Sequence, residues 1–430
     1  MDTKQLYDEY LITSMVAGFE PIVVAKASGC NVTGEDGTQY LDCFSGIAVV
    51  NAGHNHPRVV AAAKEQIDRW VHCCTYVYYN PRAGELAKLL SEVTPGKLQK
   101  TFFANSGAEA IEGALRLAKQ FTKRHELVCL TQSFHGRTWG TLSITGNRGR
   151  KKGAGPYAPG IAFTPAPYCY RCPFKTTYPG CGMACAEFLD HVLKYQTCGS
   201  VAAFVAEAVM GEGGIIVPPD EYFKIAVDLV RKDGGIFVSD EVQCGWGRTG
   251  KPFAIEHYGV EPEIMCMAKG IADGFPLGAF IARADVAAAF TPGDHLSTFG
   301  GNAVSCAAGI ANVGVMREEK LPERSAERGA QLMARFAKTK EQNKLLGDVR
   351  GKGMMIGLEL VKDAKKAPAI DEAKQVKIYC REHGVLVGTG GQFGNVIRVQ
   401  PPLIMSADDA NHAADVIEQA IQKVGATLHF

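Results

Sequence analysis

The sequence predicts an α/β protein in which a large domain, built on a mainly parallel sheet, precedes a smaller α+β unit. The clearest sign is a strand–helix–strand unit, made of an apolar run at 201–210, a helical periodicity at 220–233 and a second apolar run at 235–242. Such alternation is typical of parallel sheets, because each crossover helix returns the chain to the same edge. The chain has 430 residues, which is too long for one compact core and suits a large domain with a smaller one.

The other elements of the first part of the chain follow from the same two patterns. Residues 31–42 predict a hairpin around a Glu-Asp-Gly turn. Further buried strands are predicted at 127–130 and 264–267, and the alternation of strands and helices continues from about 55 to 290. A stretch rich in Gly, Pro, Tyr and Cys, roughly 146–182, predicts a long irregular loop, and such loops are usually functional or part of an interface.

The C-terminal part predicts a separate α+β unit behind a long helix that begins after Gly301 and ends near Lys320. Its strands are expected at 353–360, 385–387 and 396–399, and its helices at 325–341, 371–383 and 407–424. The predicted domains are an N-terminal segment 1–50 that joins the small domain, a large domain 51–310, and a C-terminal small domain 311–430.

Charge and hydropathy argue against several classes of protein. The formal net charge is +1 and no long run of Lys or Arg occurs, which argues against nucleic acid or an anionic membrane as a partner. No apolar stretch approaches the roughly 18 residues that a membrane span needs, and the polar, acidic N-terminus is unlike a signal peptide. A cytoplasmic protein with reduced cysteines is therefore expected.

The first motif with chemical meaning is a helix start at Ser106. Ser106 and Glu109 fit a capping box, and an apolar helix face follows. The backbone N–H groups of Ser106, Gly107 and Ala108 can bind an anion there with the helix dipole behind them, and Gly107 lets a phosphate approach closely. An ordinary capped helix without a ligand explains the same residues.

Asp240 and Lys269 each end a short apolar run that predicts a buried strand. A buried carboxylate needs a cationic partner, which is either a protonated pyridine nitrogen or an arginine. A buried lysine has a lowered pKa and can form a Schiff base with an aldehyde, whereas a lysine whose amine reaches solvent is the alternative. Because parallel strands bring both charges to one sheet edge, the pair and the helix start together can hold pyridoxal phosphate.

In order and spacing, these motifs resemble the class III aminotransferases, which are fold-type I enzymes that use pyridoxal phosphate. The resemblance covers nearly the whole chain and rests on the motifs at 105–110, 134–138, 207 with 211–214, 240–243, 247–250, 268–270, 298–302 and 397–398. It implies a mainly parallel seven-stranded sheet in the large domain and pyridoxal 5'-phosphate as cofactor. It also implies a homodimer, with pairing of dimers into a tetramer left open.

The resemblance implies a role for each matching position. Lys269 is expected to bind the cofactor as a Schiff base and to move protons during catalysis, and Asp240 is expected to pair with the ring nitrogen. The other cofactor-binding residues that it implies are Ser106, Gly107, Ala108, Phe134, His135, Glu207, Val242 and Gln243, together with Thr298 contributed across the dimer interface.

The substrates implied by the resemblance are an amino acid and a 2-oxo acid. Arg398 is expected to bind the α-carboxylate, and Arg137 the distal carboxylate of glutamate or 2-oxoglutarate. Glu207 is expected to neutralise Arg398 when the donor lacks an α-carboxylate, and Ile47 is expected to line the pocket. These residues favour an ω-amino acid donor similar to 4-aminobutyrate, with 2-oxoglutarate as the acceptor. Met210 departs from the family pattern, which often has a polar residue there.

Other functions stay open at this point. Fold-type I enzymes also include amino-acid racemases, epimerases and decarboxylating transaminases, so the fold does not fix the reaction. Arg137 favours transamination, because a racemase of apolar amino acids has no need for it. A binding module with an inactive cofactor site is disfavoured by the intact set of Lys269, Asp240 and Ser106.

A cysteine cluster lies in the predicted irregular loop. It consists of a C-x2-C pair and a C-x3-C pair, which are Cys169 with Cys172 and Cys181 with Cys185. The spacing is close to that of zinc ligands, but the second pair fits common zinc modules only loosely. No metal is predicted, and zinc, a disulfide and four free thiols remain as alternatives.

Overall fold

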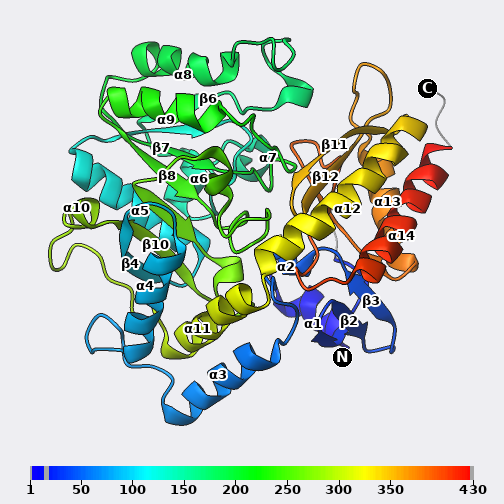
Figure 1. The fold of residues 1–430 in the computed structure, drawn as a ribbon, viewed down its shortest axis with the longest axis horizontal. Helices are drawn as coiled ribbons and strands as arrows, with labels where there is room; N and C mark the ends of the chain where they lie inside the picture. The colour runs from blue at the N-terminus through cyan, green and yellow to red at the C-terminus, as the bar shows by residue number, and fades with distance from the viewer. Residues whose placement is uncertain (1, 14–18, 427–430) are drawn as a thin grey trace.

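The computed structural model describes residues 2–13 and 19–426 of the chain. They form a large α/β part around a seven-stranded sheet and a smaller part with two four-stranded sheets (Figure 1). The predicted fold class is therefore confirmed. Residues 1, 14–18 and 427–430, which belong to the predicted segments 1–50 and 311–430, lie outside the described residues.

The large sheet is parallel except for one strand. In spatial order its strands are β4 (Leu98–Ala104), β10 (Gly278–Arg283), β9 (Ile264–Met267), β8 (Ile236–Asp240), β7 (Val201–Glu207), β5 (Glu126–Leu130) and β6 (Ile161–Thr164). Strand β10 runs antiparallel to both of its neighbours, whereas β9, β8, β7, β5 and β6 pair in parallel. Their carboxyl ends meet at one edge of the sheet, which is where ligands bind in open α/β sheets.

The central parallel strands β7, β8 and β9 are buried on both faces. Val238 packs into the core beneath helix α5 (Gly107–Thr122), and its neighbour Phe237 packs into the core of the other face, under α8 (Ala184–Tyr195) and α9 (Tyr222–Lys232). Successive side chains of a strand point to opposite faces, so a strand covered on both sides must be apolar throughout. This explains why the continuous apolar runs of the sequence correspond to strands of this sheet.

The remaining helices of the large part connect the strands or cover the edge near β4. They are α3 (Pro57–Arg69), α4 (Pro81–Val93), α6 (Trp139–Ile144), α7 (Arg148–Lys151), α10 (Ala284–Ala287) and α11 (Ala303–Glu318). In Figure 1, α11 leads from the large part to the smaller one.

The smaller part contains an antiparallel sheet with helices packed on it. The sheet has the order β11 (Leu346–Lys352), β12 (Met355–Leu360), β15 (Val396–Val399) and β14 (Gly388–Gly390). Its helices are α12 (Leu321–Gln342), α13 (Ile370–Glu382) and α14 (Ala407–Gly425).

The N-terminal segment shares a sheet with the C-terminal part. After α1 (Thr3–Tyr10), the strands β1 (Val24–Ser28), β2 (Asn31–Gly34) and β3 (Gln39–Asp42) form a meander that contains the predicted hairpin, and β13 (Val385–Leu386) pairs with β3 in parallel. The chain then makes α2 (Ser45–Ala48), a single turn in which every φ angle is positive. This turn leads directly into Val49, which lines the cavity described below.

The sequence did not reveal every strand. Five strands were not predicted, namely β1, β4, β10, β11 and β14, and β6 lies within the stretch 146–182 that was predicted to be irregular. Strand β6 has only four residues between segments rich in Gly and Pro, so its apolar pattern is too short to stand out.

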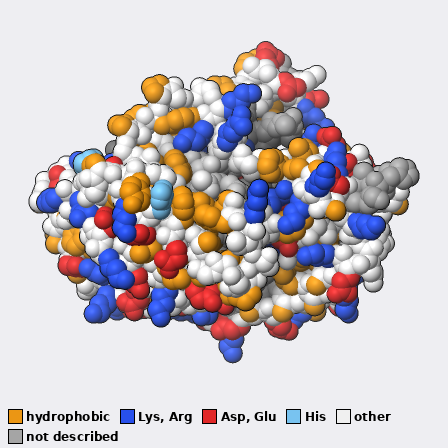
Figure 2. All heavy atoms as spheres, turned by 90° about the horizontal axis from the view of Figure 1, so that it is seen from above, with side chains coloured by type: hydrophobic (Ala, Val, Ile, Leu, Met, Phe, Trp, Pro, Cys, Tyr) orange, Lys and Arg blue, Asp and Glu red, His pale blue; other side chains and the backbone are white. Residues whose placement is uncertain are grey.

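The surface mixes charges of both signs. On the face drawn in Figure 2, acidic and basic side chains are interspersed, in keeping with the formal net charge of +1. Among the described residues, no helix is both long and apolar enough to cross a membrane. Two segments of the large part expose apolar side chains, and we call them the apolar patch: residues 77–79, and Leu296 with Phe299. The segments lie close together, because Thr75 and Asn80, on either side of the first, donate hydrogen bonds to the Gly301 carbonyl just beyond the second. The His72 ring, at the base of the first segment, lies 5.2 Å from the Phe299 ring.

Candidate active site

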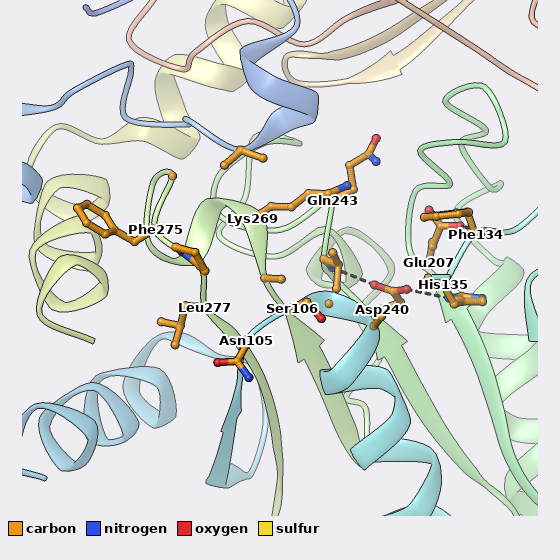
Figure 3. Close-up of a pocket in the computed structure, with 18 residues that line it drawn as sticks. Asn105, Ser106, Phe134, His135, Glu207, Asp240, Gln243, Lys269, Phe275 and Leu277 are labelled. Atoms are coloured by element: carbon orange, nitrogen blue, oxygen red, sulfur yellow. Dashed lines mark hydrogen bonds and ion pairs between the residues drawn. The ribbon is translucent and has the colours of Figure 1, made fainter. Parts of the chain in front are cut away.

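A cavity of about 350 Å³ opens at the carboxyl edge of the large sheet (Figure 3). The ends of β7 and β8 contribute Glu207 and Asp240, and Lys269 follows the end of β9. The rest of the wall consists of Val49, Asn105, Ser106, Gly107, Ala108, Phe134, His135, Gly136, Val242, Gln243, Ala268, Gly274, Phe275, Pro276 and Leu277. Asp240 and Glu207 are register partners on neighbouring parallel strands, which is why both reach the same edge.

The start of α5 forms a cradle for an anion. Ser106 caps the helix, since its hydroxyl accepts a hydrogen bond from the Glu109 N–H at 3.2 Å. In the described part of the chain, no group accepts from the backbone N–H groups of Gly107 and Ala108, which are the donors that a bound phosphate requires. A Cβ at Gly107 would lie only 2.8 Å from Val242 Cγ1, so a side chain there would intrude on the cavity wall.

Asp240 is held in the cavity floor by two hydrogen bonds. Its Oδ2 lies 2.7 Å from His135 Nδ1, and its Oδ1 accepts from the Val242 N–H at 3.0 Å. Burial alone would lower the pKa of His135, but the hydrogen bond to Asp240 and the charge of that carboxylate outweigh burial and raise it. Asp240 thus presents a fixed, buried negative charge, which is what a protonated pyridine nitrogen needs as its partner.

Lys269 occupies a constrained position beside this carboxylate. Its φ angle of 49° is uncommon for a residue other than glycine. Burial, with a smaller contribution from the charge of Arg398, lowers the pKa of its amine, although Glu212 and Asp240 oppose this shift. Within the described residues, no side chain hydrogen-bonds to the amine. A lysine with a lowered pKa is a better nucleophile toward an aldehyde, because more of it is neutral at neutral pH.

Glu207, which was expected to neutralise Arg398, makes its hydrogen bonds elsewhere in this structure. Its two carboxylate oxygens accept hydrogen bonds from the backbone N–H groups of Phe134, at 2.9 Å, and Gly211, at 2.8 Å. Burial raises the pKa of Glu207 to about 7, and Asp240 adds to this effect. Glu207 therefore ties the segment that carries Phe134 to the turn that begins at Gly211.

The partner of Arg398 is Glu212, which follows Gly211 in the same motif. Glu212 Oε1 accepts from Arg398 Nη1 at 2.7 Å, and Glu212 Oε2 accepts from Arg150 Nη2 at 2.9 Å. Burial would raise the pKa of Glu212, but the charges of Arg398 and Arg150 hold it at about 2. Neither Glu212 nor Arg150 was among the predicted site residues. A glutamate flanked by glycines just beyond a strand end was the signal that could have pointed to Glu212.

The other predicted residues divide into two groups. Phe134, Val242 and Gln243 line the cavity, and Gln243 Oε1 accepts from Gln400 Nε2 at 3.2 Å. Three residues are exposed and do not line the cavity, namely Ile47, Arg137 and Thr298. Val49, just after the left-handed turn α2, lines the cavity, whereas the Ile47 side chain within the turn is 41% exposed.

Arg137 nonetheless stays close to the cavity. Its guanidinium carbon lies 5.6 Å from the centre of the Phe134 ring, which is itself part of the wall. Thr298 adjoins the apolar patch, between Leu296 and Phe299. Its predicted role depends on a second subunit and stays a prediction.

The four cysteines of the cluster come together away from this cavity. They line a separate space of about 20 Å³, and all four are free thiols. Over residues 2–13 and 19–426, no three His, Cys, Asp or Glu side chains form a group that could hold a metal ion.

Comparison with known proteins agrees with this site. The family model "Aminotransferase class-III" matches residues 14–421. The chain belongs to the class-III aminotransferases. This aminotransferase is 40% identical over 402 residues to the acetylornithine aminotransferase of Methanothermobacter thermautotrophicus, with 94% of each chain covered. It is 38% identical to the leucine/methionine racemase of Thermococcus litoralis, covering 94% of this chain and 92% of the racemase.

Two further comparisons extend this picture. The 4-aminobutyrate aminotransferase of Mycobacterium tuberculosis is 36% identical over 413 residues, with 94% of this chain and 92% of the relative covered. Among solved structures, an aminotransferase of Bacillus anthracis superposes with a TM-score of 0.92 at 32% identity, covering 98% of this chain and all of the other. The predicted family, enzyme class and cofactor, pyridoxal 5'-phosphate, are thereby confirmed.

The residues of the cavity fit this cofactor. The helix start at Ser106 offers free N–H donors for its phosphate, and Asp240 offers an anion for its ring nitrogen. His135 Nε2 is buried without a hydrogen-bond partner, so the floor of the cavity keeps an unused polar atom beside Asp240.

Proposed function

We propose that this aminotransferase moves the amino group of an ω-amino acid similar to 4-aminobutyrate to a 2-oxo acid, with 2-oxoglutarate as acceptor. The observation that carries the proposal is the buried ion pair between Arg398 and Glu212. Its two side chains are only 4% and 11% exposed. The charges of both influence the pKa of Lys269, so the pair lies within electrostatic range of the reacting amine.

The ion pair can serve two kinds of substrate at one place. With Glu212 on Arg398, the arginine is neutralised and a donor without an α-carboxylate can bind beside it. When a 2-oxo acid binds, its carboxylate takes the place of Glu212 on the guanidinium, whose fork suits a carboxylate. Arg137, exposed beside Phe134, is the candidate for the distal carboxylate of the acceptor.

The cavity residues would then divide the chemical work. When bound, pyridoxal phosphate supplies an electron-withdrawing ring that stabilises negative charge on the reacting carbon of the substrate. Asp240 would keep the ring nitrogen protonated, because a buried carboxylate is stable only with a cation beside it. Lys269, with its lowered pKa, would take a proton from the substrate carbon and return it at a neighbouring position.

The proposal includes a homodimer. Thr298 is exposed and adjoins the apolar patch, in which the Tyr78 and Phe299 side chains are 66% and 61% exposed. Contiguous exposed apolar side chains commonly mark an interface between proteins. We propose that a second copy covers this patch and contributes its Thr298 to the phosphate cradle of the first. Sedimentation of the purified protein would test the dimer.

A donor screen tests the proposed reaction. Purified enzyme with 2-oxoglutarate is expected to form glutamate from 4-aminobutyrate or a related ω-amino acid, and Lys269→Ala is expected to abolish this. The same screen includes ornithine, β-alanine, taurine and α-amino acids. Glutamate formation from α-amino acids alone would reject the ω-amino acid proposal while leaving the family assignment intact.

Racemisation of an amino acid is the second candidate, and the similarity to the leucine/methionine racemase favours it. A racemase would exchange the α-hydrogen of a single amino acid for solvent deuterium and invert the carbon without forming a 2-oxo acid. Mass spectrometry and chiral chromatography of leucine or methionine incubated in heavy water separate the two reactions. Inversion with exchange, and no glutamate from any donor, would replace the transaminase proposal.

A further inference from the structure

The position of Arg150 gives Glu212 a second cationic partner that the proposed reaction does not yet use. Arg150 lies on the short helix α7, and Arg398 lies on β15 of the smaller part. Glu212 bridges them with one carboxylate oxygen on each guanidinium, at 2.9 Å and 2.7 Å. Two arginines and one glutamate leave a net charge of +1 at this place, which favours the arrival of one more carboxylate.

The backbone around Glu212 is fixed, so only its side chain is free to move. Gly211 N–H donates to the Glu207 carboxylate at 2.8 Å, and the Gly391 N–H donates to the Glu212 carbonyl at 3.0 Å. Beyond it, the Arg350 guanidinium donates to the Gly214 carbonyl. Release of Arg398 therefore requires a rotation of the Glu212 side chain and no movement of the loop.

Arg150 is also fixed in place by its own surroundings. Asn147 caps α7, since its side chain accepts from the Gly149 N–H at 3.0 Å, and its backbone N–H donates to the Ser133 carbonyl at 3.1 Å. Helix α7 is thus tied to the segment that follows β5, next to Phe134. The Arg150 side chain is 37% exposed, whereas that of Arg398 is 4% exposed, so Arg150 remains paired or hydrated without a large desolvation cost.

We propose that Arg150 is a specificity-determining residue, which retains the Glu212 carboxylate while Arg398 binds the carboxylate of a 2-oxo acid. This inference rests on the proposed function of the Arg398 site. Without Arg150, a displaced Glu212 would be a buried carboxylate with no hydrogen-bonded cation, which is strongly unfavourable. Arg150 lowers that cost, so the enzyme can accept both donors without an α-carboxylate and acceptors with one.

The test measures the binding of glutarate, an unreactive dicarboxylate, to the holoenzyme by isothermal titration calorimetry. Arg150→Ala is expected to raise the Kd roughly fivefold, which is the scale of a partly exposed ion pair. Arg148→Ala is the matched control, because it removes the same charge from an exposed position of the same helix, and it is expected to change the Kd by less than about twofold. Arg150→Lys is expected to lie between the wild type and Arg150→Ala.

A double-mutant cycle with Glu212→Gln distinguishes retention of Glu212 from direct binding. In the Glu212→Gln background there is no carboxylate to retain, so Arg150→Ala should leave the Kd for glutarate unchanged. If it weakens glutarate binding in that background as well, Arg150 contacts the ligand itself and the inference is wrong. An equal effect of Arg148→Ala would also overturn it, since the effect would then come from general charge. Circular dichroism checks folding, and Arg150→Lys tests the role if Arg150→Ala misfolds.

The two half-reactions separate this inference from the proposed function. With 4-aminobutyrate alone, the absorbance change of the cofactor should proceed at nearly the same rate in the wild type and in Arg150→Ala, whereas the return reaction with 2-oxoglutarate should show a raised KM. If the wild type carries out neither half-reaction, the proposed function fails, while the glutarate cycle still decides the role of Arg150. If both half-reactions occur and Arg150→Ala slows them equally, only the role of Arg150 is refuted.

Discussion

Replacing Glu212 by glutamine is expected to shift the preference of the enzyme from ω-amino donors toward α-amino acids. In the wild type the Glu212 carboxylate neutralises Arg398 at 2.7 Å. Glutamine has the same shape but no charge, so the buried Arg398 is left without a neutralising anion and binds a substrate carboxylate more favourably. An α-amino acid supplies that carboxylate, whereas 4-aminobutyrate would place its ammonium group beside an unneutralised guanidinium.

The size of this shift in substrate preference follows from the pKa of Glu212, which is about 2, whereas the ordinary value is 4.5. Each pH unit corresponds to about 1.4 kcal/mol, so the surroundings favour the ionised carboxylate by about 3 kcal/mol. Part of this comes from Arg150, which is 37% exposed and screened by water. If about 2 kcal/mol is assigned to Arg398, the ratio of kcat/KM for an α-amino acid to kcat/KM for 4-aminobutyrate is expected to rise roughly 30-fold in Glu212→Gln.

The assay compares kcat/KM for L-alanine and for 4-aminobutyrate in the amine half-reaction, followed by the absorbance of the cofactor. The ratio is expected to rise in Glu212→Gln and to stay constant in Glu221→Gln, which removes an exposed carboxylate from the same connection. A ratio that does not change, or that moves toward 4-aminobutyrate, would refute the view that Glu212 masks Arg398. The comparison uses a ratio, so a general loss of activity does not affect it.

Three further predictions concern the cofactor cradle and the buried carboxyl groups. Gly107→Ala is expected to raise the Kd for pyridoxal phosphate about tenfold or more, because the added Cβ would lie 2.8 Å from Val242. Titration of the apoenzyme with the cofactor measures this Kd, and Gly149→Ala, at an exposed position, is the control. Asp240→Asn is expected to lower the pKa of His135, which the Asp240 carboxylate raises in the wild type; an imidazole titration by NMR that shows no such fall would contradict the assignment. Burial raises the pKa of Glu241 to about 7 from an ordinary value of 4.5, so the folded state holds this proton more tightly than the unfolded state does. The free energy of unfolding should therefore fall as the pH rises from about 4.5 to about 7, by up to ~3 kcal/mol, and urea unfolding at several pH values should show a flatter dependence in Glu241→Gln.

Much of the large part could be predicted because its strands are buried on both faces. Residues 236–238, which lead to Asp240, and residues 264–267, which precede Lys269, all pack into the apolar core, and their parallel pairing brings both charges to one edge. The helix start at Ser106 was predictable for a similar reason, since its capping chemistry is local. Strand β10 was missed, although its side chains are buried like those of the predicted strands, and its antiparallel direction departs from the strand–helix alternation used to find them.

The partner of Arg398 could not be predicted from local patterns. Both Glu207 and Glu212 lie near the end of β7, and sequence spacing does not say which of them turns toward the smaller part. Glu207 is still in the strand, so its direction is set by the pleat, and it meets the N–H groups of Phe134 and Gly211. The chain then reverses, with Met210 bridging to Ile216, and this turn directs Glu212 toward β15.

Arg150 and Arg398 illustrate what sequence can and cannot decide about a buried charge. Elementary electrostatics requires that a buried arginine near Lys269 have an anion, but it leaves open which anion supplies the charge. In the sequence, Arg398 follows Glu212 by 186 residues and Arg150 precedes it by 62, so only the fold brings the three together. In the folded protein, the need to pair buried charges also selects substrates. A substrate carboxylate can pair with Arg398 only if another cation pairs with the displaced Glu212. The specificity of this site thus depends on the pair of arginines together, and a change at the exposed one should alter which carboxylates the buried one accepts.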